Sequence, residues 1–244
     1  MVLIKTIIAF AITILTVIIF TPIGLLLFVF GLPGLKTPIS LATYKIAQGW
    51  ARIIIYVTGC SMEVLGRENI PRSGGFCFVS NHVGIFDIIL ILAYAGRPFG
   101  FIAKKELMLL PFINVWISIL GGLFIDRKSI RHAIKTINRG IERIQKGGRM
   151  LIFPEGTRSK GRGLLPFRSG AIKLATHSLA PLVPIAITGS YEVFEKHYRL
   201  HSVPVRIVFC PPIITADMSV EERRKNLAGE VRSTIEAALL QAAL

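Results

Sequence analysis

The sequence predicts an α/β protein: a mixed sheet of about seven strands flanked by helices, preceded by an N-terminal hydrophobic helical membrane-anchoring segment. Two observations predict this fold class. From Met62 onward, short runs of β-branched and aromatic residues alternate with longer amphipathic patterns, which is typical of α/β sheets. Before them, the thirty residues from Thr6 to Leu35 carry no charge and lie between Lys5 and Lys36. A run of this length and composition indicates a membrane helix.

The geometry of the apolar run is open, because Pro22 and Gly24 interrupt it. A single tilted span and a re-entrant hairpin both fit. A helix over Ser40–Thr58 follows, and its narrow polar stripe suits either the membrane interface or packing on the domain. The stripe consists of Lys45, Gln48 and Arg52. Because cations are more numerous after the apolar run than before it, we expect a membrane protein whose catalytic or binding domain lies on the cytoplasmic face.

We expect residues 1–60 to form the membrane-associated helical segment and residues 61–244 to form one α/β domain. Seven runs in this domain have the composition of strands. They are Met62–Gly66, Gly75–Ser80, Phe99–Lys104, Gly122–Arg127, Met150–Phe153, Leu182–Ile187 and Val205–Phe209.

Helical patterns lie between and after these strands. Over Ser129–Lys146, apolar residues recur at helical spacing on one face. They are Ile130, Ala133, Ile134, Ile137, Ile141 and Ile144. A further helix is expected from Ser219, where Glu222 completes a capping box. The apolar segment 107–120 fits a buried core, the wall of an apolar ligand groove or a surface that enters lipid.

Composition narrows the class of partner. The chain has 244 residues and a formal charge of +15, so it favours an anionic partner such as nucleic acid, phospholipid headgroups or a phosphorylated substrate. Its three cysteines, Cys60, Cys77 and Cys210, show no CxxC spacing. They indicate small buried apolar residues in a reducing compartment, with neither a disulfide framework nor a zinc site.

The stretch "VSNHVGIFDIIL" carries the first candidate site. His82 and Asp87 follow a short apolar strand, at the strand edge where α/β proteins hold functional groups. Gly84 allows a bend that brings the two side chains together, so that the carboxylate keeps one ring nitrogen protonated and the other is free to accept a proton. The alternative is structural: Asp87 as an acid in the first turn of a helix and His82 as its cap.

The stretch "LIFPEGTRS" predicts an anion site. Glu155, Gly156 and Arg158 follow an apolar strand, and turn amides together with guanidinium groups bind anions. The loop is not a nucleotide-binding P-loop, because Arg162 and Gly163 stand where that motif needs Lys and Ser or Thr. "GGLFIDR" adds Arg127 at the end of another strand.

The blocks "NHVGIFD", "GLFIDR", "FPEGTRS" and "VPIAI" resemble, in order and approximate spacing, the four motifs of the glycerolipid acyltransferase family. The likeness spans residues 81–187 and is strongest to enzymes that convert lysophosphatidic acid to phosphatidic acid. The resemblance implies direct acyl transfer, with His82 as general base oriented by Asp87. It also implies that Arg127, Glu155, Gly156 and Arg158 bind the glycerol phosphate. Thr157 and Lys105 complete the expected substrate-binding set, although Lys105, at the end of a strand, fits a solvated surface charge equally well.

The resemblance implies no bound cofactor and no metal. An acyl-CoA or acyl carrier protein thioester serves as co-substrate, and the partners are lysophosphatidic acid and a phospholipid membrane, not nucleic acid. The absence of a GxSxG motif agrees with catalysis that uses no protein nucleophile. Two alternatives stay open: a sibling acyltransferase acting on glycerol 3-phosphate or another lysolipid, and a non-enzymatic basic protein that binds membrane or nucleic acid.

Overall fold

The structure is a computed structural model that describes residues 2–30, 36–215 and 218–241. All seven expected strands are present and form one sheet in the order β1-β7-β6-β2-β5-β3-β4. Their bounds are β1 Ser61–Leu65, β2 Phe76–Ser80, β3 Gly100–Lys104, β4 Leu123–Ile125, β5 Arg149–Ile152, β6 Leu182–Thr188 and β7 Pro204–Phe209. The pair β6–β7 is antiparallel and the other pairs are parallel. The predicted mixed sheet is therefore confirmed.

The strand directions define one functional edge. Strands β6, β2, β5, β3 and β4 run the same way, so their carboxyl ends meet at one edge of the sheet. Strands β1 and β7 run the opposite way. Residues that directly follow the five parallel strands therefore gather at this edge. In open α/β sheets, binding and catalytic sites lie at the carboxyl ends of the strands.

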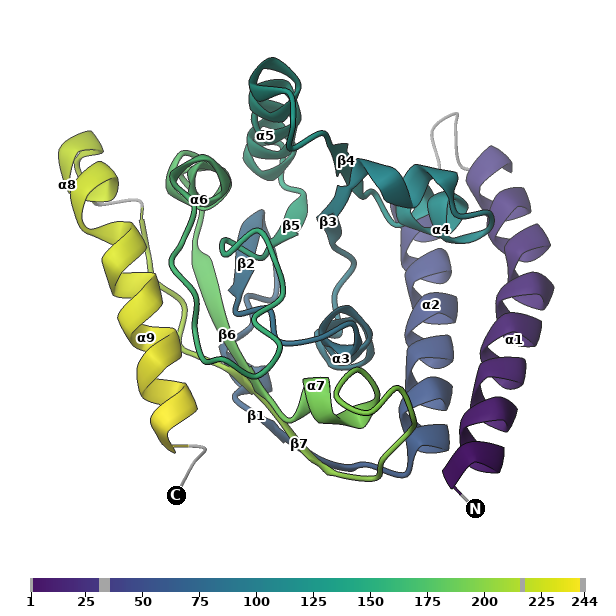
Figure 1. Ribbon diagram of the computed structural model, residues 1–244. Helices are drawn as coiled ribbons and strands as arrows, with labels where there is room; N and C mark the ends of the chain where they lie inside the picture. The colour runs from purple at the N-terminus through teal and green to yellow at the C-terminus, as the bar shows by residue number, and fades with distance from the viewer. Residues whose placement is uncertain (1, 31–35, 216–217, 242–244) are drawn as a thin grey trace.

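Helices cover both faces of the sheet (Figure 1). Along β2, Phe76 and Phe78 face a core shared with α2 and α3, whereas Cys77 and Val79 face a core shared with α5, α6 and α9. This alternation follows from the two-residue period of a strand, and both faces are apolar because both are covered. The helices are α1 Val2–Phe30, α2 Lys36–Thr58, α3 Phe86–Tyr94, α4 Ile113–Ile119, α5 Ile130–Gln145, α6 Ser169–Thr176, α7 Ser190–Val193, α8 Val220–Lys225 and α9 Leu227–Gln241, with 3-10 turns η1 Arg67–Asn69 and η2 Lys105–Leu109.

Helix α1 packs along the domain for most of its length. Near its start, Lys5 Nζ donates to Ser202 Oγ at 2.7 Å, and near its end Thr21 Oγ1 accepts from the indole N–H of Trp116 at 3.0 Å. The helix continues through Pro22, and the end of the apolar run at residues 31–35 lies outside the described residues. The stretch Val2–Leu26 is long and apolar enough to cross a membrane. Most of the large apolar side chains in this stretch are exposed on the surface of the protein.

Helix α2 uses its polar stripe against the domain. The side-chain amide of Gln48 and the guanidinium of Arg52 both donate to the backbone carbonyl of Ala93, at the end of α3. Tyr44, which is buried, donates to the carbonyl of Leu92. Of the two expected environments for this helix, the structure therefore shows packing on the domain.

The buried face of α5 differs from the one the isoleucine pattern predicts. Ile137 and Ile144 are buried as expected, but Ile130 and Ile134 are exposed. Because positions seven apart lie on nearly the same side of a helix, Ile130 is on the side of Ile137 and Ile144, so its exposure reflects its place in the first turn of α5. Farther along, Gly140 lies against α6, where a Cβ would be only 2.4 Å from Leu174 Cδ1.

Segment 107–120 forms the end of η2 and the helix α4. Met108, Leu109 and Phe112 are exposed, so the buried-core interpretation is wrong for the first half of the segment. In the second half, Ile117 is buried and Trp116 packs against Gly24 of α1. At the other end of the chain, the predicted capping box of Ser219 and Glu222 is present and begins α8.

Candidate active site

The site begins where β2 ends. Asn81 follows β2 directly, and its buried side-chain amide bonds both backbone groups of Ile187 in β6. The carbonyl oxygen of the amide accepts from Ile187 N–H at 2.8 Å, and its NH₂ donates to Ile187 O at 2.9 Å. The Asn81 side chain thus adds one more pair of hydrogen bonds beyond the last backbone pair of β2 and β6. The backbone therefore leaves the sheet from a fixed position.

His82 and Asp87 are in contact in the turn that follows. His82 Nδ1 lies 2.7 Å from Asp87 Oδ2, and Asp87 is fully buried. The same oxygen accepts the backbone N–H groups of Val83 at 2.6 Å and Gly84 at 3.0 Å. The Ser190 hydroxyl donates to Oδ1. A buried carboxylate requires such partners, and together they hold the side chain of Asp87 in place.

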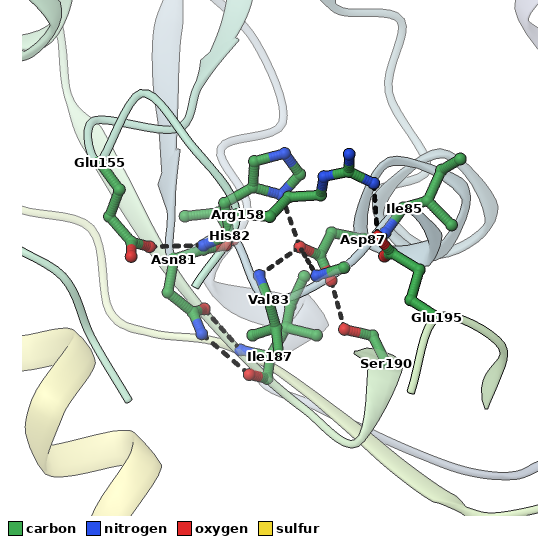
Figure 2. A network of polar contacts seen from close by, with 12 residues as sticks. Asn81, His82, Val83, Ile85, Asp87, Glu155, Arg158, Ile187, Ser190 and Glu195 are labelled. Atoms are coloured by element: carbon green, nitrogen blue, oxygen red, sulfur yellow. Dashed lines mark hydrogen bonds and ion pairs between the residues drawn. The ribbon is translucent and has the colours of Figure 1, made fainter. Parts of the chain in front are cut away.

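The imidazole of His82 is held in one orientation. Its ring stacks on Phe153, with 4.0 Å between ring centroids and planes 19° apart. Because the buried carboxylate binds Nδ1, the proton of the neutral ring resides on Nδ1, and Nε2 is the basic atom. Figure 2 shows Nε2 pointing away from Asp87. The His82 side chain is 22% exposed, so Nε2 is accessible from outside.

The loop "FPEGTRS" is joined to the His82 turn through the main chain. Ser159 N–H donates to His82 O at 2.7 Å, and Lys160 N–H donates to Val83 O at 3.1 Å. The buried carboxylate of Glu155 ties the same loops, with Oε1 accepting His82 N–H at 2.6 Å and Oε2 accepting Leu165 N–H at 2.9 Å. Burial raises the pKa of Glu155. Residues 155–160 therefore hold a fixed position relative to His82.

Gly156 allows the loop to turn sharply. Its φ is +67°, and a Cβ there would lie 2.7 Å from Cδ of Arg168. Arg168 crosses directly over the glycine and donates from Nε to Glu155 O at 3.2 Å. The next residue, Thr157, is exposed.

The side chain of Arg158 is fixed by a carboxylate from another part of the chain. Its Nη1 lies 2.5 Å from Oε1 of Glu195, which follows α7. Oε2 of Glu195 accepts the N–H of Ile85, the residue at the start of α3. A chain of contacts therefore runs from Arg158 to the turn that holds His82 and Asp87 (Figure 2).

Two more expected cations stand at the ends of the neighbouring strands β3 and β4. Lys105 Nζ lies 2.5 Å from Asp126 Oδ2, and this hydrogen bond raises the pKa of Lys105. Arg127 is exposed as a whole, yet partial desolvation of its guanidinium, and then the like charge of Arg168, lower its pKa. Arg168, whose charge contributes to this shift, lies over Gly156. The sheet edge carries a cluster of positive charge.

The sequence did not single out Phe153, Ser190 or Glu195 as site residues. Phe153 is the first residue of the block "FPEGTRS", but an apolar residue at a strand end carries no signal for ring stacking. Ser190 and Glu195 follow β6, whose carboxyl end lies beside that of β2. The rule that sites gather at carboxyl ends of parallel strands was the available signal for both.

Known proteins share the sequence and the fold. A family model described as Acyltransferase matches residues 61–188. A 1-acyl-sn-glycerol-3-phosphate acyltransferase of Escherichia coli is 30% identical over 179 residues, which cover 73% of this chain and 72% of that protein. The enzyme of that name from Borreliella burgdorferi is 28% identical, covering 75% and 74%. The chloroplastic protein BAT2 of Brassica napus is 34% identical over 75% of this chain and 54% of its own.

One solved structure matches nearly the whole chain. The 1-acyl-sn-glycerophosphate acyltransferase PlsC of Thermotoga maritima superposes with a TM-score of 0.86, covering 99% of this chain and 96% of that one. At 24% identity this likeness bears on the fold, and it includes the N-terminal helices. Within the described residues, no group of three or more His, Cys, Asp or Glu side chains is placed to hold a metal ion.

Proposed function

Since the chain belongs to the acyltransferase family, we propose that it transfers an acyl chain from an acyl thioester to the free hydroxyl of 1-acyl-glycerol 3-phosphate, giving phosphatidic acid. The names of the relatives support this acceptor. The observation that carries the proposal is the contact of His82 with the buried, fully hydrogen-bonded Asp87. This pair is a base with a fixed tautomer and one accessible nitrogen.

In the proposed reaction, Nε2 of His82 takes the proton from the acceptor hydroxyl while that oxygen attacks the thioester carbonyl. The C–O bond forms, and the imidazolium is stabilised by the carboxylate of Asp87. The tetrahedral intermediate then expels the thiolate, which receives the proton from His82 Nε2. Base and carboxylate return to their starting states, and no acyl group is attached to the protein.

The acceptor phosphate is assigned to the cations at the same edge. Arg168 lies over Gly156 and Arg158 follows it in the same loop, whereas Lys105 and Arg127 stand at the carboxyl ends of β3 and β4. Phosphate held there places the hydroxyl beside His82 and removes part of the entropic barrier. Glu155 serves this site indirectly, because its two carboxylate oxygens are engaged by backbone N–H groups and hold the loop.

The thioester donor is a co-substrate, either acyl-CoA or acyl carrier protein, and the proposal includes no bound cofactor. We propose that residues 1–60 serve as the anchor and residues 61–244 as the catalytic unit, on the cytoplasmic face of the membrane. The exposed apolar side of α1 supports attachment to lipid. Its contacts with the domain at Lys5 and at Thr21 favour attachment along one leaflet over a full crossing, because the helix stays with the domain over the sixteen positions between them.

The test is acyl transfer by purified His82→Ala protein in lipid micelles, measured as thiol release with lysophosphatidate as acceptor. Turnover should fall to the background rate, because the base is gone, while membrane binding and thermal unfolding stay unchanged. His177→Ala is the matched control, since His177 is an exposed histidine at the end of α6. Turnover of the His82 variant near that of the control would refute the mechanism. Running acyl-CoA and acyl carrier protein side by side identifies the donor.

A further inference from the structure

Glu195 joins two parts of the site that lie far apart in the sequence. Its side chain is 13% exposed, and its two oxygens have different partners: Arg158 Nη1 for Oε1 and the backbone N–H of Ile85 for Oε2. Figure 2 shows both contacts. The N–H of Ile85 belongs to the backbone at the start of α3, so it fixes the carboxylate, and the carboxylate in turn fixes the guanidinium.

A carboxylate next to a phosphate-binding arginine repels the phosphate, so a carboxylate at this position needs an explanation. The Arg158 side chain is 40% exposed, whereas Glu195 is largely covered, so an anion from outside meets the arginine and not the carboxylate. A guanidinium has five N–H donors in a rigid plane, and the contact with Glu195 uses Nη1. The other donors keep their fixed directions, and within residues 2–30, 36–215 and 218–241 none of them has a hydrogen-bond partner, so they are able to meet an anion at the open side.

We propose that Glu195 is a positioning residue for the acceptor phosphate: it holds Arg158 in the orientation in which the remaining donors receive that group. The inference rests on the proposed function, in which Arg158 binds the phosphate. Ordering a long side chain before the lipid arrives lowers the entropy lost on binding. The tether also sets the place of the guanidinium relative to the turn that carries His82, because Ile85 belongs to that turn.

The structure predicts that Glu195→Gln breaks the tether even though it preserves size and shape. Both carboxylate oxygens accept N–H donors, and the amide has a single oxygen. Its NH₂ must therefore face either Ile85 N–H or the guanidinium of Arg158, placing donor against donor. A residue needed only for packing would tolerate this change.

The experiment is steady-state kinetics of the full-length protein in micelles. With lysophosphatidate, Glu195→Gln should raise KM about tenfold, the scale of one charge-assisted hydrogen bond, and change kcat less than about twofold. The KM for the acyl thioester should not move. With 1-monoacylglycerol, which has no phosphate, the variant and the wild type should react equally. Glu192→Gln is the matched control, because Glu192 pairs with Lys196 on the surface of the same segment.

The double variant with Arg158→Ala identifies the route of the effect. If Glu195 acts through Arg158, adding Glu195→Gln to Arg158→Ala raises KM no further. If Arg158→Ala raises KM but Glu195→Gln does not, or if the two effects multiply, the positioning role is overturned and the phosphate role of Arg158 stands. If Arg158→Ala leaves the KM for lysophosphatidate unchanged, the phosphate role itself fails, and the positioning role fails with it.

Discussion

Replacing Asp87 by asparagine separates two contributions of this carboxylate, its geometry and its charge. Three N–H donors converge on Oδ2, from the His82 ring and from Val83 and Gly84, whereas Oδ1 meets the Ser190 hydroxyl. The amide oxygen of asparagine therefore fits the Oδ2 position. Its NH₂ then faces Ser190 Oγ, which accepts as readily as it donates.

The asparagine variant is thus expected to keep the proton on Nδ1 and to lose only the charge. A hydrogen bond to a charged group contributes about 1.5–3 kcal/mol and a neutral one about 0.5–1.5 kcal/mol. The imidazolium in the transition state should therefore lose about 1–2 kcal/mol of stabilisation, which lowers kcat about 5- to 30-fold. Asp87→Ala removes the acceptor altogether, and kcat should fall about a thousandfold or more, as when a catalytic histidine adopts the wrong tautomer.

The assay is thiol release at saturating lysophosphatidate and thioester, with both variants checked for thermal unfolding. The order of activities is the critical result: wild type, then asparagine, then alanine, with a clear gap between the variants. An asparagine variant as inactive as His82→Ala would refute the assigned amide orientation. Full activity in either variant would refute the role of the carboxylate.

Two further predictions concern stability and reactivity. Gly140→Ala should destabilise the protein by about 1–3 kcal/mol in urea unfolding, because the new Cβ meets Leu174 Cδ1 at 2.4 Å. Gly229→Ala in α9, where nothing lies within 4 Å, should stabilise it by about 0.5–1 kcal/mol, and equal effects of the two would contradict the close packing. Burial raises the pKa of Cys210 to about 11, so about one molecule in a thousand is thiolate at pH 8. Iodoacetamide at pH 8 should label half-buried Cys60 long before Cys210 in peptide mass spectra, and comparable rates in the folded protein would show that Cys210 is accessible.

The strands were predictable because their signal is local. Each is a short run of β-branched or aromatic residues, and the apolar character of both faces, as in the run from Phe76 to Val79, indicates a covered sheet. The contact of His82 with Asp87 was equally accessible, since the spacing and Gly84 lie within one turn. These features depend on residues fewer than ten positions apart.

The unpredicted contacts join distant parts of the chain. Ser190 and Glu195 reach the His82 turn across more than a hundred residues, and no local pattern marks a serine or glutamate as the partner of a particular side chain. The close approach of α5 to α6 has the same origin, because the contact between Gly140 and Leu174 depends on how two helices cross. Hydrophobic periodicity indicates which face of a helix points inward, but it does not show how close a neighbouring helix comes to that face.

The main-chain bonds between the His82 turn and the Ser159–Lys160 segment have a consequence for regiochemistry. They hold the His82 turn and the segment that follows Arg158 in one relative position, so that with the roles proposed for these two residues the base and the guanidinium would act together as a molecular ruler. In 1-acyl-glycerol 3-phosphate the free hydroxyl is on the carbon next to the one that bears the phosphoester. In the 2-acyl isomer it is one carbon further away, and an acceptor gripped by its phosphate would present that oxygen out of register with the imidazole.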